Sequence, residues 1–241
     1  MQRELWVVAM GRVPYADALA LQREIARDRI AGDIAQDVLL LVEHPPVVTL
    51  GRSAKAHNLV GSPELLAARG VEVHEVERGG DVTFHGPGQL VGYPIIDLKR
   101  HRQDLHWYLR QVEEALIVAL DDLGVVAARH PGLTGVWTSG RKIASIGVHA
   151  RDWVTWHGFA LNVTTDLSFF DLIVPCGIDG VVMTNLWREL NGAGPSWEAV
   201  ELTVARAFAE VFRLTPVDAD LGESLPRSGA TLTADEATST G

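Results

Sequence analysis

The strongest constraint on the fold is a one-sided helical pattern at residues 104–124, DLHWYLRQVEEALIVALDDLG. Its apolar residues recur every three or four positions and form one stripe, so this helix must pack one face against another layer. Asp104 can cap its start and Gly124 its end. The chain has 241 residues, 47% of them hydrophobic, so it can supply that second layer from a core of its own.

Strand patterns on both sides of the helix indicate what it packs against. We expect strands at 4–10, in two pieces of 37–52 divided at Pro45–Pro46, around 72–78 and 89–97, and in a hairpin over 142–163 turning near Arg151–Asp152. Further helices are expected at 15–32, 62–70 and 196–213. Because strands and helices are mixed without strict βαβ alternation, the sequence predicts a single α/β domain, of the α+β kind with a mixed sheet and flanking helices.

The C-terminal stretch differs in composition from the rest of the chain. Residues 217–241 are rich in Ser, Thr, Asp, Gly and Ala, and five acidic residues against one arginine make this stretch acidic. We expect it to be a disordered tail, so that the catalytic domain would span residues 1–216.

Charge and cysteine content narrow the class of protein. The net charge of −10 argues against general nucleic-acid binding. The chain shows no signal-peptide layout, and its apolar stretches fall short of the ~20 residues that span a bilayer, so we expect no membrane association. A single cysteine cannot form an internal disulfide, which favours a reducing, cytoplasmic location.

That cysteine, Cys176, lies in the stretch IVPCGIDG, between Pro175 and Gly177. A lone cysteine is usually a small buried apolar residue, and that reading stays open here. As a nucleophile it would need a base or a cation beside it, since a free thiol with a pKa near ~8.5 is mostly protonated at neutral pH. The candidate partners are His85, His149, His157 and Lys142.

Lysine usage draws attention to one of these partners. Only three of the 21 basic residues are lysines, namely Lys55, Lys99 and Lys142. Arginine cannot give up its proton in a protein, whereas a desolvated lysine can, so a lysine in this chain is a candidate base. Chance placement of three lysines is the alternative reading.

Two glycine-rich segments suggest close backbone approach. The stretch 78–94 has five glycines in 17 residues and lacks the lysine and hydroxyl residue of a phosphate-binding P-loop. In the expected hairpin, Ser145 and Gly147 share a sheet face with Gly158 and Ala160. These small residues leave a groove for a slim apolar ligand or for a closely packed helix. The spacings of Cys and His fit no compact metal motif, so we expect no metal.

Five ordered stretches resemble the lipoyl (octanoyl) transferases, which are octanoyl–acyl carrier protein:protein N-octanoyltransferases. They are LLLVEHPPVVTLGR, RGGDVTFHGPGQLVGYPIIDL, GVWTSGRKIASIGVH, HGFALNV and VPCGI. The resemblance runs from about residue 5 to residue 213 and leaves out the tail. It implies the α/β domain that this family shares with lipoate and biotin protein ligases.

The resemblance also implies an activity. An octanoyl group would pass from its thioester on acyl carrier protein to Cys176, and then to a lysine on a lipoyl domain of 2-oxoacid dehydrogenases or on the glycine cleavage H protein. Lys142 would be the general base, no cofactor would be needed, and the enzyme would be a monomer. The implied substrate-binding residues are Arg78, Gly79, Gly80, Asp81, Val82, Thr83, Phe84, His85, Ser145, Ile146, Gly147, Gly158, Phe159 and Ala160.

Other functions remain open at this stage. The first alternative is an ATP-dependent lipoate or biotin ligase, which would have no use for a thiol. A non-catalytic acyl-binding module and a cysteine hydrolase are the others. Because the acidic chain would have to meet acidic partners, we also expect a local basic rim, formed by Lys99, Arg100 and Arg102.

Overall fold

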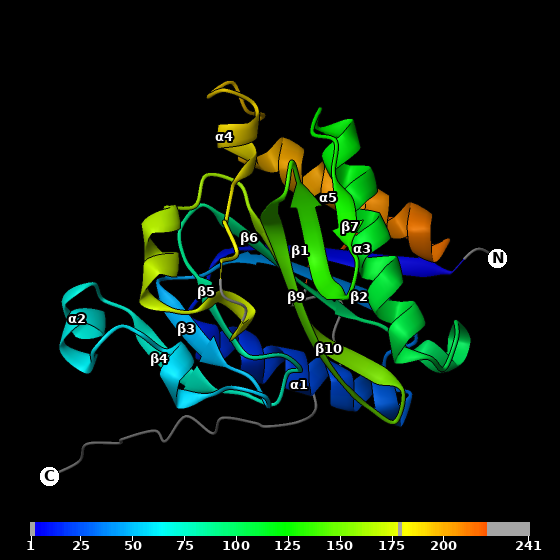
Figure 1. The fold of residues 1–241 in the computed structure, drawn as a ribbon. Helices are drawn as coiled ribbons and strands as arrows, with labels where there is room; N and C mark the ends of the chain where they lie inside the picture. The colour runs from blue at the N-terminus through cyan, green and yellow to red at the C-terminus, as the bar shows by residue number, and fades with distance from the viewer. Residues whose placement is uncertain (1–2, 178–179, 221–241) are drawn as a thin grey trace, which may run out of the picture.

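The computed structural model describes residues 3–177 and 180–220, except for the side chain of Cys176. Within this part, eight strands form one mixed sheet in the order β11-β1-β2-β6-β10-β9-β8-β7 (Figure 1). Their bounds are β1 (Glu4–Arg12), β2 (Asp37–Glu43), β6 (Gln89–Ile95), β7 (Ala128–His130), β8 (Leu133–Thr138), β9 (Arg141–Arg151), β10 (Val154–Asn162) and β11 (Thr215–Asp218). A second sheet has the order β4-β3-β5, with β3 (Val47–Leu50), β4 (Glu72–Glu75) and β5 (Val82–His85).

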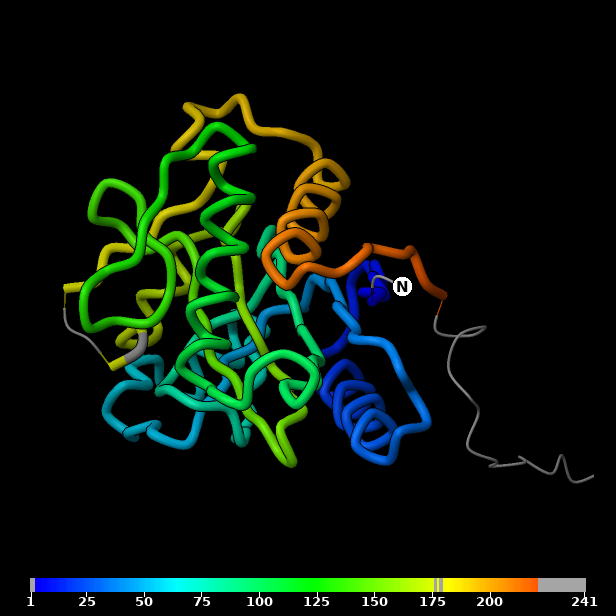
Figure 2. The backbone as a smooth tube through the Cα atoms, turned by 90° about the vertical axis from the view of Figure 1, so that its right-hand side faces the viewer, coloured from blue at the N-terminus to red at the C-terminus, as the bar shows by residue number. Residues whose placement is uncertain are grey.

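Helices cover both faces of the large sheet. The helices are α1 (Tyr15–Ala31), α2 (Pro63–Ala68), α3 (Leu105–Asp122), α4 (Leu186–Glu189) and α5 (Trp197–Phe212), and the 3-10 turns are η1 (Ala56–Asn58), η2 (Leu98–Arg100), η3 (Leu167–Leu172) and η4 (Pro175–Gly177). The apolar stripe of α3 packs with α5 on one face, and α1 packs on the other (Figures 1 and 2). None of the described helices is long and apolar enough to cross a membrane.

Local sequence signals explain where the main helices begin and end. Asp104 accepts a hydrogen bond from the Trp107 N–H at the start of α3, and Ser196 does the same for the Ala199 N–H at the start of α5. Gly32 adopts the left-handed conformation just after α1, with φ +89°. The predicted helices and the mixed arrangement of the sheet are therefore confirmed.

The structure also contains strands that the sequence patterns did not reveal. β5 lies inside the glycine-rich stretch that was expected to be a loop, and β7 and β8 precede the hairpin. β11 pairs in parallel with β1 through Asp218, which is one residue beyond the expected start of the disordered tail at residue 217. This backbone pairing orders the beginning of the segment, while residues 221–241 lie outside the described residues.

The β9–β10 hairpin places its small residues on one sheet face, as the sequence suggested. Its turn is at Asp152–Trp153, one residue later than expected, and both residues have positive φ, as a tight hairpin turn requires. Gly147 pairs with Gly158 and Ser145 pairs with Ala160. These four small residues therefore lie together in the centre of the large sheet.

Candidate active site

A pocket of about 260 Å³ lies between the hairpin and the loop that precedes β5. Twelve of the fourteen predicted substrate-binding residues line it, namely Arg78, Gly80, Asp81, Val82, Thr83, His85, Ser145, Ile146, Gly147, Gly158, Phe159 and Ala160. The other lining residues are Tyr15, Val91, Tyr93, Gly132, Leu133, Thr134 and His157. Of these seven, His157 was expected only as a candidate partner of Cys176, and the other six have no local motif that marks them as functional.

The two remaining predicted residues support the pocket from outside. The Gly79 N–H donates to the Val148 carbonyl at 2.8 Å and so ties the loop to β9. The Phe84 ring turns away and stacks on Phe169, with ring centroids 4.7 Å apart. The Phe84 side chain belongs to an apolar cluster on the other side of β5 and does not line this pocket.

Arg78 is buried and holds the loop in place. Its Nε donates to Thr49 Oγ1 at 3.1 Å, its Nη2 to the Thr49 carbonyl at 2.6 Å, and its Nη1 to the Gly79 carbonyl at 3.1 Å. A guanidinium presents five N–H donors in a fixed planar fork, a geometry that a lysine ammonium lacks. Arg78 therefore fixes the pocket wall to β3 as well as lining it.

The sequence suggested that the small residues of the hairpin leave an open groove. The glycines instead allow neighbouring backbone to approach closely. A Cβ on Gly147 would come 2.8 Å from the Gly79 carbonyl oxygen, and one on Gly158 would collide with the Gly92 carbonyl oxygen. Neighbouring backbone thus fills the room that the missing side chains leave. The pocket is consequently bounded by backbone on two sides.

Residues 174–177, which contain Cys176 and are called the cysteine loop here, are anchored next to this pocket. The Val174 N–H donates to the Asn58 carbonyl at 2.8 Å, and Asn58 Nδ2 donates to Asp81 Oδ2 at 2.7 Å. Gly177 has φ +66°, and a Cβ there would come 2.5 Å from Asp81 Oδ2. The backbone of η4 therefore lies directly against a residue that lines the pocket. The Cys176 side chain itself lies outside the described residues.

Lys142 lies near the start of β9 and is only 1% exposed. Between it and Ser145 the pairing of β9 with β8 is irregular, since Lys142 pairs with Trp137 whereas Ala144 pairs with Val136. A regular strand would point Lys142 and Ser145 to opposite faces. The extra residue in β9 changes that alternation, as a β-bulge does.

The Lys142 amine rests in a niche made by β8. Its Nζ lies 5.0 Å from the centre of the Trp137 ring. A Cβ on Gly135 would come 2.8 Å from Lys142 Cε and 3.3 Å from its Nζ, so only glycine leaves room for the lysine. Gly135 directly follows Thr134, which lines the pocket. Trp137 and Gly135 were not identified from the sequence, although both belong to the GVWTSG stretch.

The three histidines proposed as partners of the cysteine have different locations. His85 and His157 line the pocket, whereas His149 packs on Trp156 and approaches the Glu77 carbonyl. Burial lowers the pKa of His85 to about 3 and also lowers the pKa of His157. Both histidines are therefore neutral near pH 7, which suits a pocket for an uncharged chain.

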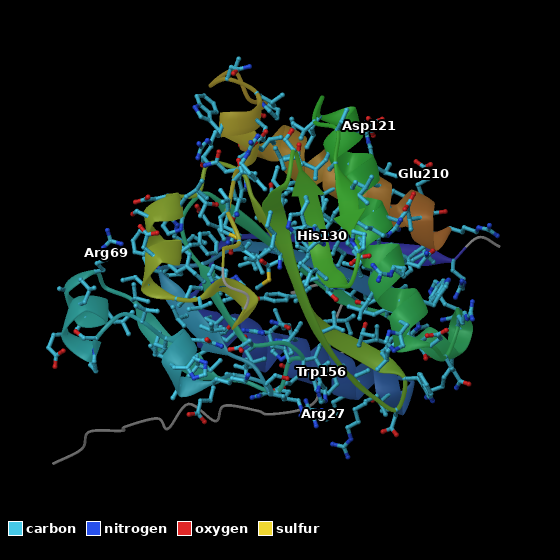
Figure 3. The ribbon with its side chains drawn as sticks, in the orientation of Figure 1. Arg27, Arg69, Asp121, His130, Trp156 and Glu210 are labelled. Atoms are coloured by element: carbon cyan, nitrogen blue, oxygen red, sulfur yellow. The ribbon has the colours of Figure 1, made fainter. Side chains whose placement is uncertain are left out.

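The expected basic rim is not at this site. η2, which contains Lys99 and Arg100, follows a bridge between Asp97 and Val154 at the turn end of the hairpin. Arg102 pairs with Asp104 in the same region. Lys142 is at the opposite end of β9, roughly 30 Å away at ~3.3 Å per strand residue. Figure 3 labels Trp156 and Arg27 near that turn end, remote from α4 and the start of β9.

No group of three or more His, Cys, Asp or Glu side chains suited to a metal ion occurs in the described part of the chain. The cavity borders instead offer apolar walls, neutral histidines and tyrosine hydroxyls. Burial raises the pKa of Tyr15 to about 12, so this phenol is protonated at neutral pH.

Comparison with known proteins gives these observations a family context. Residues 14–209 match the model of the lipoyl protein ligase A/B catalytic domain. A Nostoc sp. protein named octanoyltransferase is 50% identical over 208 residues, which are 86% of this chain and 92% of the relative. An octanoyltransferase of Rubrobacter xylanophilus is 53% identical over 203 residues, covering 83% and 90%.

Solved structures show the same fold at low sequence identity. A bi-partite lipoate protein ligase from Thermoplasma acidophilum, described with its E2 lipoyl domain, has a TM-score of 0.73 at 18% identity and covers 92% of this chain and 89% of that chain. Lipoate-protein ligase A bound with ATP has a TM-score of 0.70 at 18% identity, covering 93% and 91%. The predicted fold shared with lipoate ligases is confirmed.

Proposed function

Because the chain belongs to the lipoyl protein ligase A/B catalytic domain family, we propose that it transfers an octanoyl group from acyl carrier protein to lysines of lipoyl domains. The glycine cleavage H protein would be a further acceptor. Relatives at about half identity over most of their length carry the name octanoyltransferase, so the chain is an acyltransferase of this class. The proposal adds the donor, the acceptors and the covalent route.

One observation carries the covalent route. Lys142, one of only three lysines, is buried, and its backbone is hydrogen-bonded to residues that closely follow Cys176. The Lys142 N–H donates to the Val182 carbonyl at 2.8 Å, and the Thr184 N–H donates to the Lys142 carbonyl at 2.9 Å. We therefore assign the Lys142 amine as the acceptor of the thiol proton, a role that arginine cannot fill.

The proposed reaction has two balanced steps. Lys142 takes the Cys176 proton, the thiolate attacks the donor's thioester carbonyl, and the departing donor thiolate recovers that proton. The acceptor lysine amine then attacks the Cys176 thioester, loses a proton to Lys142, and the Cys176 thiolate leaves and is reprotonated. The bond changes from thioester to thioester and then to amide, so no ATP is consumed.

The test is intact-protein mass spectrometry after mixing with octanoyl–acyl carrier protein in the absence of ATP. We expect a gain of about 126 Da, one octanoyl group, that is lost in Cys176→Ala and strongly slowed in Lys142→Arg. An ATP-dependent ligase would need ATP and would tolerate Cys176→Ser. An acyl-binding module would give no adduct, and a hydrolase would release free octanoate. Failure of the wild-type protein to form the adduct would refute the proposal.

A further inference from the structure

A short segment takes over the position next to β9 that β10 leaves. The last β10 residue paired with β9 is Leu161, opposite Ala144. Beyond that point Lys142 forms a parallel bridge with Met183, through the two backbone hydrogen bonds to Val182 and Thr184. The segment 182–184, which follows the cysteine loop in the chain, is therefore hydrogen-bonded to the backbone of Lys142.

Side chains fix this segment from two directions. Asn162, at the end of β10, donates from Nδ2 to the Thr184 carbonyl at 2.9 Å. Thr184 Oγ1 donates to Glu189 Oε1 on α4. Glu189 in turn accepts from Arg141, with Nε to Oε1 at 3.0 Å and Nη2 to Oε2 at 2.8 Å. The single Glu189 carboxylate thus binds both Arg141, the neighbour of Lys142 in the chain, and Thr184, whose N–H donates to the Lys142 carbonyl.

These contacts close a ring. Arg141 is covalently bonded to Lys142, Lys142 is hydrogen-bonded to Thr184, and Glu189 joins Thr184 back to Arg141. We propose that Glu189 is a positioning residue, which acts through Arg141 and Thr184 to hold Lys142 in register with the cysteine loop. The inference rests on the proposed function, since it assigns a role in the proton transfer from thiol to amine.

The environment supports an ionised carboxylate in this role. Arg141 lowers the pKa of Glu189 by hydrogen bonding, and Glu189 is mostly buried, with 10% of its side chain exposed. A two-point bond between a guanidinium and a carboxylate fixes orientation better than a single contact. Glu189 is therefore charged at working pH and holds Arg141 rigidly.

Loss of this anchor should show up in the pH dependence of the chemistry. If the Lys142 amine is mispositioned, acylation should be slower at those pH values where the Cys176 thiol needs the amine to remove its proton. The defect should shrink as pH rises through the free-thiol pKa of ~8.5, because the thiolate then forms without help. A loss of stability alone would not be repaired by raising the pH. The charged groups nearest the bridge between Lys142 and Met183 are Arg141, Glu189 and Arg188. Glu113, with its partners Arg110 and Arg129, accepts from the Gly135 N–H next to the Lys142 side chain. Asp81 lies against Gly177.

The experiment measures single-turnover acylation by octanoyl–acyl carrier protein from pH 6.5 to 9.5, together with donor KM and thermal unfolding. Glu189→Gln keeps the shape and removes the charge, and Thr184→Val removes only the hydroxyl. Glu114→Gln, which removes an exposed carboxylate paired with Arg129, is the matched control. We expect both test variants to acylate at least ~10-fold more slowly at pH 7, with donor KM unchanged and the defect largely gone at pH 9.5.

The possible outcomes separate the two proposals. Wild-type protein that forms no adduct overturns the proposed function and this inference with it. If the wild type forms the adduct while both variants keep its pH–rate profile, only the role of Glu189 is refuted. A defect that is the same at every pH and follows the fraction of unfolded protein also refutes it.

Discussion

Gly135→Ala should impair catalysis by moving the lysine amine. Gly135 has φ +130°, and an added Cβ would come 2.7 Å from the Ala144 carbonyl oxygen and 2.8 Å from Lys142 Cε. To reach ordinary contact at 3.4 Å, the lysine side chain must retreat by roughly 0.6 Å. Since a misplacement of ~1 Å can cost ~100-fold in rate, we expect acylation to slow by about 10- to 100-fold. The backbone conformation adds a stability cost of ~1–3 kcal/mol.

The turn between β8 and β9 provides a matched control for this prediction. Gly140 also has a positive φ, +75°, but a Cβ there would have no heavy atom within 4 Å. Gly140→Ala should therefore lose about 1–2 kcal/mol of stability and keep its acylation rate. Both variants are compared by thermal unfolding and by the rate of octanoyl adduct formation in mass spectrometry. Equal acylation rates for the two variants would refute the claim that Gly135 makes room for Lys142.

Three further predictions concern the cysteine loop, the pocket wall and the buried histidines. Gly177→Ala, whose Cβ would press on Asp81, should slow adduct formation by about 10-fold or more, whereas Gly180→Ala, with open space around its Cβ, should not; equal rates would contradict this. Arg78→Lys should lower the melting temperature and the adduct rate together, because lysine cannot replace the bonds to Thr49 and Gly79; an unchanged melting temperature would count against it. Burial lowers the folded-state pKa of His85 to about 3 and of His44 to about 4, both below the ordinary 6.5, so the unfolded state gains protons first as pH falls. Each histidine should therefore cost about 2 kcal/mol of stability at pH 5 and almost nothing above pH 7, and urea unfolding of His85→Asn should show a correspondingly smaller acid loss than the wild type.

Local sequence signals predicted the structure correctly where residues close together in the chain determine it. The stripe and caps of α3, the positive φ at Gly32 and the hairpin register of Ser145 and Gly147 all follow from residue order. β5 was missed because its glycine-rich surroundings are typical of a loop, and its pairing partner β3 lies over thirty residues earlier. Non-local pairing of this kind leaves no periodic pattern in the sequence.

The site shows the same division. Motif resemblance identified most of the pocket, whereas Tyr15 and Tyr93 reach it only because α1 packs against β10 and β6 pairs with β10. The residues predicted to form a basic rim lie far from Lys142 for a related reason. Lys99 and Arg100 follow the stretch ending in PIIDL that resembles the family, but η2 is bonded to the turn end of the hairpin, as the Leu98 N–H donating to the Trp153 carbonyl shows. Distance along the chain gave no measure of distance from Lys142.

The glycines lead to a mechanical view of the pocket. Gly147 and Gly158 are required because the Gly79 and Gly92 carbonyls press against them, so backbone rather than rotatable side chains sets the width of the pocket. Backbone held by sheet hydrogen bonds and by Arg78 cannot adjust by rotamer changes. Lys142 is also held in place, because Gly135 leaves room for its side chain and the bridge to Met183 fixes its backbone. A rigid pocket and a fixed Lys142 suit the proposed reaction, in which the octanoyl carbonyl is attacked first by Cys176 and then by the acceptor lysine at the same place.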